Sequence, residues 1–453
     1  MADNNTVNSS PLTVHDPIPY GKQNITEEDI NAVVEVLKSD YLTQGPKIPE
    51  LEKAFAEYVG SKYAVAVSNG TAALHLNALA LGVKPGDKVI TTPITFAASA
   101  NCVRYCGGEV VFADIDPETY LLDINNVRKI LEAETKKEIK GIIPVDFAGR
   151  AVDLEAFRAL ADEFNCWIIE DSCHSPGGFF IDSQGERQHC GNGNFADLAI
   201  FSFHPVKHIA AGEGGMITTN DETLYHKLTE LRTHGITKDA SKFQNTIDFA
   251  IGVQITENSE QKKEDGFNIN TVDSSPLTVY PNWYMEMQNL GYNYRLTDFQ
   301  AALASSQLKR AGEGLARRRE IAGIYKEAFK TIPQITDRNF EVSSKQKTEQ
   351  DENSSPFTAH SSLNYGHAHH LYVIEVENRL GLYNYLREHH IYTQIHYLPC
   401  HLMPYYKEQG WKEGGLPNAE SYYSGCISLP MFPTLSKEEQ EFVIQKIKEF
   451  FNQ

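Results

Sequence analysis

The stretch LAIFSFHPVKHIAAGEGG, residues 198–215, joins an apolar segment to a lysine and a run of small residues. LAIFSF at 198–203 is typical of a strand that is buried on both faces, because its apolar residues continue without polar alternation. Lys207 follows this strand, and the small residues of AAGEGG leave space around it. A lysine placed there can be desolvated and lose its proton, which makes its amine competent to form a Schiff base. A lone lysine is usually a surface residue, so this interpretation depends on what the chain places beside it.

Short apolar segments recur through the first half of the chain, and helical patterns such as DLEAFRALADEF at 153–164 separate most of them. The segments are YAVAV (63–67), KVITT (88–92), VVFADI (110–115), GIIPVDF (141–147) and CWIIED (166–171). This alternation predicts an α/β fold with a mostly parallel sheet that helices cover on both faces. Sites in such folds lie at the carboxyl ends of the strands.

The pattern changes after residues 296–329, which predict one long helix that weakens near Gly312 and Gly314. Strand-like and helical patterns then alternate in HHLYVIEV (369–376), GLYNYLREHH (381–390) and IYTQIHYLP (391–399). We therefore expect a large domain over 17–310 and a smaller α+β domain over 311–453.

Three similar polar segments interrupt this organisation. They are NTVNSSPLTV (5–14), NTVDSSPLTV (270–279) and the looser copy ENSSPFTAH (352–360). Such segments bury too little apolar surface to offset the entropy lost on ordering. We interpret 1–16 as a disordered tail, and about 243–280 and about 338–365 as polar loop insertions; a docking role is the alternative.

Composition excludes several classes of protein. The net charge of -19 argues against a nucleic-acid partner, which would require a basic face. No apolar run approaches the roughly 18 residues of a membrane span, and the first residues lack the pattern of a secretory signal. The seven cysteines are odd in number and contain no C-x-x-C, which favours reduced thiols in the cytoplasm. Cys173-His174 and His189-Cys190 match no usual metal-ligand spacing, so we expect no metal site.

Three further stretches bring candidate ligand-binding residues to strand ends. AVSNGTAALHLNAL (66–79) leads from a strand into a helix, whose free N–H groups bind phosphate; a simple Asn or Thr cap is the alternative. TTPITFAASAN (91–101) places Phe96 either in the core or against a flat ligand. Glu170 and Asp171 should face opposite sides of their strand, so only one meets a ligand there. A buried carboxylate requires a cationic or hydrogen-bonding partner, and a protonated pyridine nitrogen would serve.

Together these stretches resemble pyridoxal-phosphate enzymes of the aspartate aminotransferase fold (fold type I), and more narrowly the sugar-nucleotide aminotransferase family. The resemblance covers nearly the whole chain apart from the insertions. It rests on SNGTAAL, TTPITFAASAN, IIEDSCHSPGG, FSFHPVKHIAAGEGGMITTN, LGYNYRLTDFQAAL and IHYLPCHLMPYY. It implies a mostly parallel seven-stranded sheet domain with a smaller α+β C-terminal domain, pyridoxal 5′-phosphate as cofactor, and a homodimer with shared active sites.

The resemblance also implies roles for individual residues. Lys207 would hold the cofactor covalently, Asp171 would pair with its pyridinium nitrogen, and His174 would lie near its phenolic oxygen. The other cofactor contacts implied are Phe96 on the ring, Thr71, Ala72 and Ser202 at the phosphate, and Asn293 from a neighbouring subunit. The substrate contacts implied are Tyr20, Lys22, Arg295, His396, Tyr397 and His401, for which surface placement or packing is the alternative.

Both ends of the chain are similar to the C4 aminotransferase branch of the pseudaminic acid pathway. The similarity lies in the segment that begins PYGKQNITEED and in HYLPCHLMPYY and SLPMFPTLSKEEQ. It implies a UDP-4-keto-6-deoxy-N-acetylhexosamine as amino acceptor and L-glutamate as donor. One departure is HAHHL at 367–371, where His369 takes a position that is commonly aromatic in relatives.

Other functions are weighed against this one. A C4 aminotransferase for another nucleotide sugar, of the bacillosamine or perosamine type, is the main alternative. A histidine in place of Lys207 would have indicated the dehydratase branch of the family. A cofactor-binding protein without turnover is disfavoured by the presence of both Asp171 and Lys207.

Overall fold

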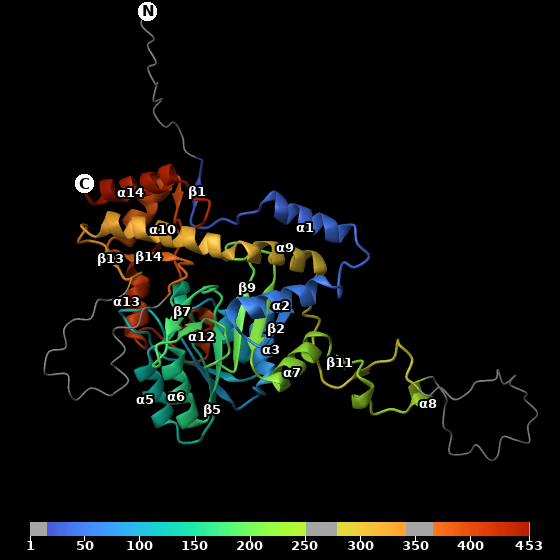
Figure 1. Cartoon of the computed structure of the whole chain (residues 1–453). Coiled ribbons are helices and arrows are strands. Elements are labelled where there is room, and N and C mark those ends of the chain that lie inside the picture. Colours follow the sequence, from blue (N-terminus) through green and yellow to red (C-terminus); the bar gives the residue numbers. More distant parts are fainter. Residues whose placement is uncertain (1–15, 251–278, 341–365, 453) are drawn as a thin grey trace, which may run out of the picture.

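The computed structural model describes residues 16–250, 279–340 and 366–452, and a seven-stranded sheet lies at the centre of its larger unit (Figure 1). The strand order is β2-β10-β9-β6-β5-β3-β4. Only β10 runs antiparallel to its neighbours, so the prediction of a mostly parallel seven-stranded sheet is confirmed. The strands are β2 (Tyr63–Val67), β3 (Lys88–Thr91), β4 (Glu109–Phe112), β5 (Ile139–Ile143), β6 (Trp167–Asp171), β9 (Leu198–Ser202) and β10 (Gly215–Thr219).

Alternate residues of these strands pack into separate cores on the two faces of the sheet. Ile169 and Ile200 pack into one core, whereas Ile168 and Phe201 pack on the opposite face. Both faces are apolar because helices cover both, as the unbroken apolar runs indicate. The first face is covered by α3 (Gly70–Ala80), α4 (Ala98–Tyr105) and α7 (Glu222–Arg232), and the second by α2 (Lys47–Val59), α5 (Ile124–Ala133) and α6 (Leu154–Phe164).

Two helices replace the single long helix expected over 296–329. They are α9 (Asp298–Lys309) and α10 (Ala311–Phe329), and they meet at Arg310. Arg310 has φ of -113°, outside the helical range, and its guanidinium contacts the carbonyl of Asn24. The break therefore falls two residues before Gly312, where tertiary contacts hold Arg310 out of helical geometry.

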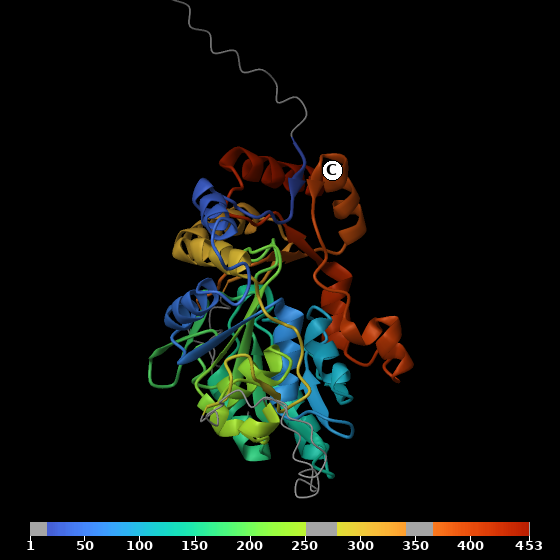
Figure 2. The same ribbon diagram turned by 90° about the vertical axis from the view of Figure 1, so that its right-hand side faces the viewer.

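A second core lies at one end of the sheet unit and includes the first described strand of the chain (Figure 2). Ile18 belongs to this core because β1 (Ile18–Pro19) pairs with β15 (Ile391–Tyr392). A three-stranded antiparallel sheet and three helices complete it: β13 (Thr336–Asp337), β14 (Tyr372–Glu375), β16 (Cys426–Leu429), α10, α11 (Arg379–Glu388) and α14 (Lys437–Phe451).

The remaining elements are short or peripheral. They are α1 (Glu27–Leu37), α8 (Ile247–Ala250), α12 (Pro404–Glu408), α13 (Pro417–Gly425), β7 (Phe179–Ile181), β8 (Arg187–His189), β11 (Ile236–Thr237) and β12 (Glu286–Met287). The polar repeats and most of the expected tail and insertions lie outside the described residues. Within the described part of the chain, no helix has the length and apolar character needed to cross a membrane.

Candidate active site

A cavity of about 1010 Å³ lies at the carboxyl ends of β2, β3, β6 and β9. Residues that follow each of these strands line it, and the segment 394–398 closes it from the C-terminal unit. Ten of the predicted site residues line this cavity: Tyr20, Thr71, Ala72, Phe96, Asp171, His174, Ser202, Lys207, His396 and Tyr397. The structure therefore brings most of the residues predicted for the active site together in this cavity.

Asp171 provides a buried carboxylate in this cavity. Ser99 Oγ donates a hydrogen bond to its Oδ2 at 2.6 Å, and the N–H of Cys173 donates to Oδ1 at 3.2 Å. No Lys, Arg or His in the described parts of the chain forms an ion pair with Asp171. A buried carboxylate held in this way still lacks a cationic partner, so the site favours a positively charged group on its ligand.

Lys207 lies in the loop after β9 and extends its amine into the same cavity. Its Nζ lies 3.3 Å from Nε2 of His370. Burial lowers the pKa of Lys207, the charge of Arg318 adds to this shift, and the charge of Asp171 opposes it only in part. A lysine with a lowered pKa is more often the free amine, which is the form that attacks a carbonyl.

The turn before α3 forms the third wall of the cavity. Asn69 caps the helix by accepting a hydrogen bond from the N–H of Ala72 at 2.8 Å. The N–H groups of Gly70 and Thr71 have no acceptor within the helix, because first-turn donors lack one. A Cβ at Gly70 would lie 3.1 Å from Cβ of Ser202, so glycine allows this turn to approach β9 closely. The start of α3 and Ser202 both line the cavity, an arrangement that suits the binding of an anion.

His174 is buried beside Asp171 and has a defined tautomer. The N–H of Ala148 donates to its Nδ1 at 3.2 Å, so the proton of the neutral ring is on Nε2, 3.2 Å from the Tyr397 hydroxyl. Burial and the charge of Lys207 hold the pKa of His174 well below its usual range. Since Nε2–H donates to the Tyr397 oxygen, the Tyr397 hydroxyl proton is available to a ligand.

Phe96 is 63% exposed, although it is a large apolar residue beside buried ones. Its ring faces the cavity rather than the core, 6.5 Å from the ring of Tyr397. The stacking alternative is therefore favoured over core packing for this residue.

Four predicted substrate or cofactor residues lie outside the cavity. His401 is fully buried, and its Nε2 lies 3.0 Å from Oε1 of Glu420, which favours the packing alternative. Asn293 is exposed and Arg295 half-buried, in the segment that bridges to Thr233 and Val67. Lys22 lines a separate, smaller cavity on the other side of Lys207.

Two contributors to the site were missed by sequence reasoning. Ser99 holds Asp171, and His370 contacts Lys207. Ser99 was within a quoted motif, but its partner lies 72 residues away in sequence. His370 comes from the C-terminal unit, and no local pattern links it to Lys207.

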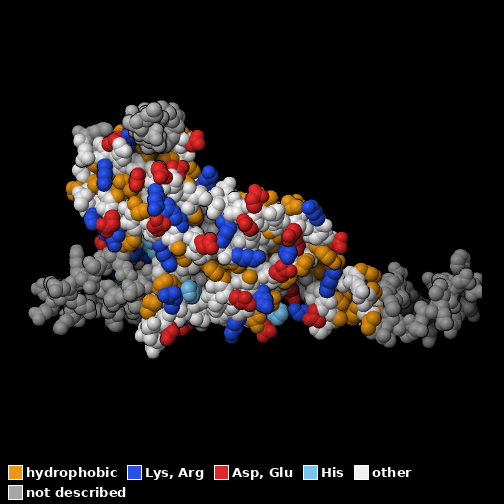
Figure 3. Space-filling model, turned by 45° about the horizontal axis from the view of Figure 1, so that its top comes forward, with side chains coloured by type: hydrophobic (Ala, Val, Ile, Leu, Met, Phe, Trp, Pro, Cys, Tyr) orange, Lys and Arg blue, Asp and Glu red, His pale blue; other side chains and the backbone are white. Residues whose placement is uncertain are grey.

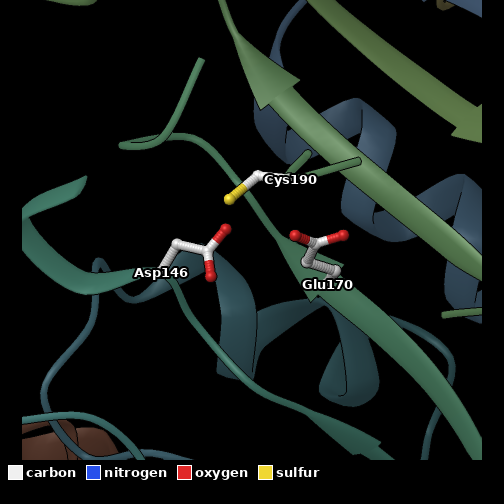
Figure 4. Close-up of side chains that lie close together, drawn as sticks. All are labelled: Asp146, Glu170 and Cys190. Carbon is white, nitrogen blue, oxygen red and sulfur yellow. The ribbon is translucent and has the colours of Figure 1, made fainter. Parts of the chain in front are cut away.

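Glu170 faces away from the cavity, as strand alternation predicts, and lies close to Asp146 and Cys190 (Figure 4). Asp146 accepts hydrogen bonds from Ser175 Oγ at 2.6 Å and from the N–H of Val152 at 2.9 Å. Glu170 Oε2 accepts from the N–H of Gly191 at 2.9 Å, while Oε1 has no partner. Burial raises the pKa of Glu170 well above its usual range, and the charge of Asp146 adds to this. Glu170 is therefore the member of the pair that retains a proton.

The sheet order and the cavity define the class of pyridoxal-phosphate enzymes with the aspartate aminotransferase fold. The model of the DegT/DnrJ/EryC1/StrS aminotransferase family matches residues 23–448, and the chain belongs to this family. It is accordingly a sugar aminotransferase, and pyridoxal 5′-phosphate is its cofactor.

Individual relatives match over nearly their full length. The chain is 35% identical over 440 residues to the spore coat polysaccharide biosynthesis protein SpsC of Bacillus subtilis, covering 95% of this chain and 96% of that protein. The putative sugar aminotransferase Spr1654 of Streptococcus pneumoniae, in its PLP form, superposes with a TM-score of 0.75 at 26% identity, covering 96% of this chain and 99% of that one. Helicobacter pylori PseC, an aminotransferase involved in the biosynthesis of pseudaminic acid, superposes with a TM-score of 0.74 at 27% identity, covering 96% and 100%.

The residues present fit the cofactor. Asp171 is a buried carboxylate that no Lys, Arg or His of the described residues pairs with, the end of α3 presents free donors beside Ser202, and Lys207 supplies an amine to the same cavity. These three features match the pyridinium nitrogen, the phosphate and the aldehyde of pyridoxal phosphate, respectively.

Proposed function

We propose that the protein transfers the amino group of L-glutamate to C4 of a UDP-4-keto-6-deoxy-N-acetylhexosamine, the amination step of the pseudaminic acid pathway. The observation that carries the proposal is that one cavity of about 1010 Å³ is lined by both Lys207 and Asp171. The volume suits a cofactor together with a nucleotide sugar. Similarity to the pseudaminic acid enzyme of Helicobacter pylori supports the choice of sugar.

Each cofactor-contacting residue has a separate task in this proposal. Asp171 keeps the pyridine nitrogen protonated, Thr71, Ala72 and Ser202 hold the phosphate, and Phe96 stacks on the ring. His174 lies by the phenolic oxygen and, through Nε2–H, orients Tyr397. The cofactor, when bound, supplies an electron sink for the carbanion formed at the carbon that carries the amine.

Lys207 acts twice as the proton carrier. It would take the proton from Cα of glutamate and pass it to the bound cofactor, which would keep the amino group, and one water molecule would release the carbon skeleton as 2-oxoglutarate. With the keto sugar bound, Lys207 returns a proton in the reverse sense to C4 of the sugar. Burial favours this role because it lowers the pKa of the lysine toward the range in which an amine both accepts and donates protons.

Sugar recognition is assigned to the residues at the outer wall of the cavity. Tyr20, His396 and Tyr397 line it, and burial lowers the pKa of His396 to about 3, so its ring is neutral. His396 Nδ1 lies 2.8 Å from the Ser428 hydroxyl, which fixes its ring orientation. Neutral side chains with fixed orientation suit hydroxyl and acetamido groups of a sugar.

The active protein is proposed to be a homodimer with shared active sites. Four large apolar side chains of the segment that includes β12 are more than half exposed or nearly so: Trp283, Met285, Met287 and Leu290. Apolar side chains gather beside the grey segment on the right of Figure 3. Exposed apolar side chains of this kind suit a surface that a second copy covers, and Asn293 and Arg295 follow in the same segment.

A reducing compartment, the cytoplasm, is proposed as the location. All seven cysteines are free thiols, and five of them are buried. Free cysteines in this number persist where thiols are kept reduced.

The test uses enzyme first loaded with the amino group by glutamate. It is then mixed with UDP-2-acetamido-2,6-dideoxy-4-hexuloses of the L-arabino and D-xylo configurations while the cofactor absorbance is followed. Fast return of the aldehyde-form spectrum with the L-arabino sugar alone supports the proposal. Return with D-xylo alone assigns the enzyme to a bacillosamine-type reaction, and return with neither, after normal reaction with glutamate, contradicts the choice of sugar.

A further inference from the structure

A second cavity, of about 210 Å³, lies on the other side of Lys207 from the large one. The loop after β9, the junction of α9 and α10, and the N-terminal segment before α1 enclose it. Five lysine or arginine side chains line it: Lys22, Lys207, Arg310, Arg317 and Arg318. Glu313 is the single acidic residue of its lining. In a chain with a net charge of -19, this excess of positive charge is confined to one small chamber.

Two of these cations are already neutralised. Arg310 forms an ion pair with the buried carboxylate of Asp29, and Arg317 Nη1 lies 2.7 Å from Oε2 of Glu320. Lys22, Lys207 and Arg318 have no carboxylate within ion-pair distance in the described residues. The exposed Glu313 offsets only part of their charge.

Arg318 is the strongest indication that an anion belongs here. Its side chain is only 2% exposed, and Nη1 donates to the carbonyls of Met431 (2.9 Å), His370 (3.2 Å) and His369 (3.3 Å). Its Nε has no acceptor. Burial lowers the pKa of Arg318 to about 10, but the group is still charged at neutral pH. A buried guanidinium that only neutral carbonyls contact is costly, so an anionic ligand that pairs with it is stabilised.

We propose that this chamber binds a small oxyanion, a carboxylate or a phosphate group, between Lys22 and Arg318 and next to Lys207. Arg318 offers planar donors that suit either group, and Lys22 adds a flexible charge at the exposed side. The volume accommodates a small anion and not an entire nucleotide sugar. An anion bound here would stabilise the protonated amine of Lys207 and so couple its occupancy to the reactivity of that residue.

Two sources share this chemistry. A carboxylate would come from the amino donor or its keto acid, an assignment that rests on glutamate being the donor as proposed above. A phosphate would come from free inorganic phosphate. The site itself depends on neither, because it is argued from Arg318 and its neighbours alone.

The test is calorimetric titration of the holoenzyme, in its pyridoxal form, with 2-oxoglutarate and separately with inorganic phosphate. Neither probe turns over in this form, so the result is independent of the sugar substrate. The variants are Lys22→Ala and Glu313→Gln, which change exposed side chains and therefore preserve the fold. Lys53→Ala is the control, because it removes the positive charge of another exposed lysine that does not line the chamber.

We expect Lys22→Ala to weaken binding about fivefold and Glu313→Gln to tighten it about twofold, with Lys53→Ala unchanged. If the chamber variants change the dissociation constant of 2-oxoglutarate alone, the site binds carboxylates. If they change that of phosphate alone, the site binds phosphate. The proposal is overturned if neither anion binds, or if the dissociation constants are the same in both chamber variants as in the control.

Discussion

Glu170 and Asp171 are consecutive residues of β6, but the sheet places their carboxyls in two different environments. Asp171 points into the large cavity, where Ser99 Oγ and the N–H of Cys173 donate hydrogen bonds to its two oxygens. Glu170 points to the opposite face, where Asp146 lies close by and burial favours the protonated form. The comparison shows that burial by itself does not decide the charge of a carboxyl. The decisive factor is whether its neighbours are donors or another acid.

Among residues that line the large cavity, Lys207 should have the largest effect on kcat when it is replaced. Lys207→Ala deletes both the covalent attachment and the proton carrier, so we expect kcat to fall by at least about 1,000-fold, with little change in the free energy of unfolding. The measurement is amination of the keto sugar, together with the glutamate-induced change in cofactor absorbance. Lys53→Ala provides the control, and substantial amination by Lys207→Ala would remove this residue from the mechanism.

The two carboxyls can be compared by one chemical change at adjacent positions. Asp171→Asn should lower kcat by about 100-fold, because an amide cannot pair with a protonated ring nitrogen; this corresponds to about 2.7 kcal/mol. Glu170→Gln should change kcat by less than about twofold, since the protonated acid and the amide are similar in shape and charge. Equal losses in the two variants, measured as kcat under saturating substrates, would mean that the faces are not functionally distinct.

Glu170, on the face of the sheet opposite the cavity, should instead make the free energy of unfolding depend on pH. The pKa of Glu170 is raised in the folded protein, so folding retains a proton that the unfolded chain releases above its ordinary pKa. The contribution of Glu170 to the free energy of unfolding is then fully present at low pH, and it is lost as the pH rises from the unfolded pKa toward the folded pKa of this group. Glu170→Gln should remove this loss and make the variant more stable than the wild type at pH 8 by about 1 kcal/mol. Urea unfolding from pH 5 to pH 8 measures it, and parallel pH profiles would contradict the assignment of the proton.

The smallest effect on kcat among the cavity residues is expected from Ser99, one of two serines that donate a hydrogen bond to a buried carboxyl. Ser99→Ala removes the 2.6 Å hydrogen bond to Asp171, and Ser175→Ala removes the equally short bond to Asp146. We expect Ser99→Ala to lower kcat about fivefold, while Ser175→Ala lowers the free energy of unfolding by about 1–2 kcal/mol and leaves kcat within twofold. Kinetics and urea unfolding of both variants check this. If Ser175→Ala lowered kcat and Ser99→Ala lowered only the free energy of unfolding, the two faces of β6 would not have the separate roles described above.

Local pattern was sufficient for much of the fold and for the centre of the site. Apolar runs predicted six of the seven strands of the sheet but not β10, and the strand ends placed Asp171 and Lys207 at the carboxyl edge, where both line one cavity. The break between α9 and α10 was misplaced, because a contact between Arg310 and the distant Asn24 decides it. His401 was predicted to contact substrate, but the structure buries it against Glu420.

What the chain's own residues establish is the alternation of strands and helices and the chemistry at each strand end, since periodicity and residue type are local properties. The separation of Glu170 from Asp171 also follows from local geometry, because strand side chains alternate. Three other features depend on groups that are distant in sequence. They are the proton retained by Glu170, the hydrogen bond from the Ser99 hydroxyl to Asp171, and the lack of a carboxylate partner for Arg318. Only tertiary packing brings these groups together, because the pKa and pairing of a buried charge depend on which partners share its low-dielectric surroundings.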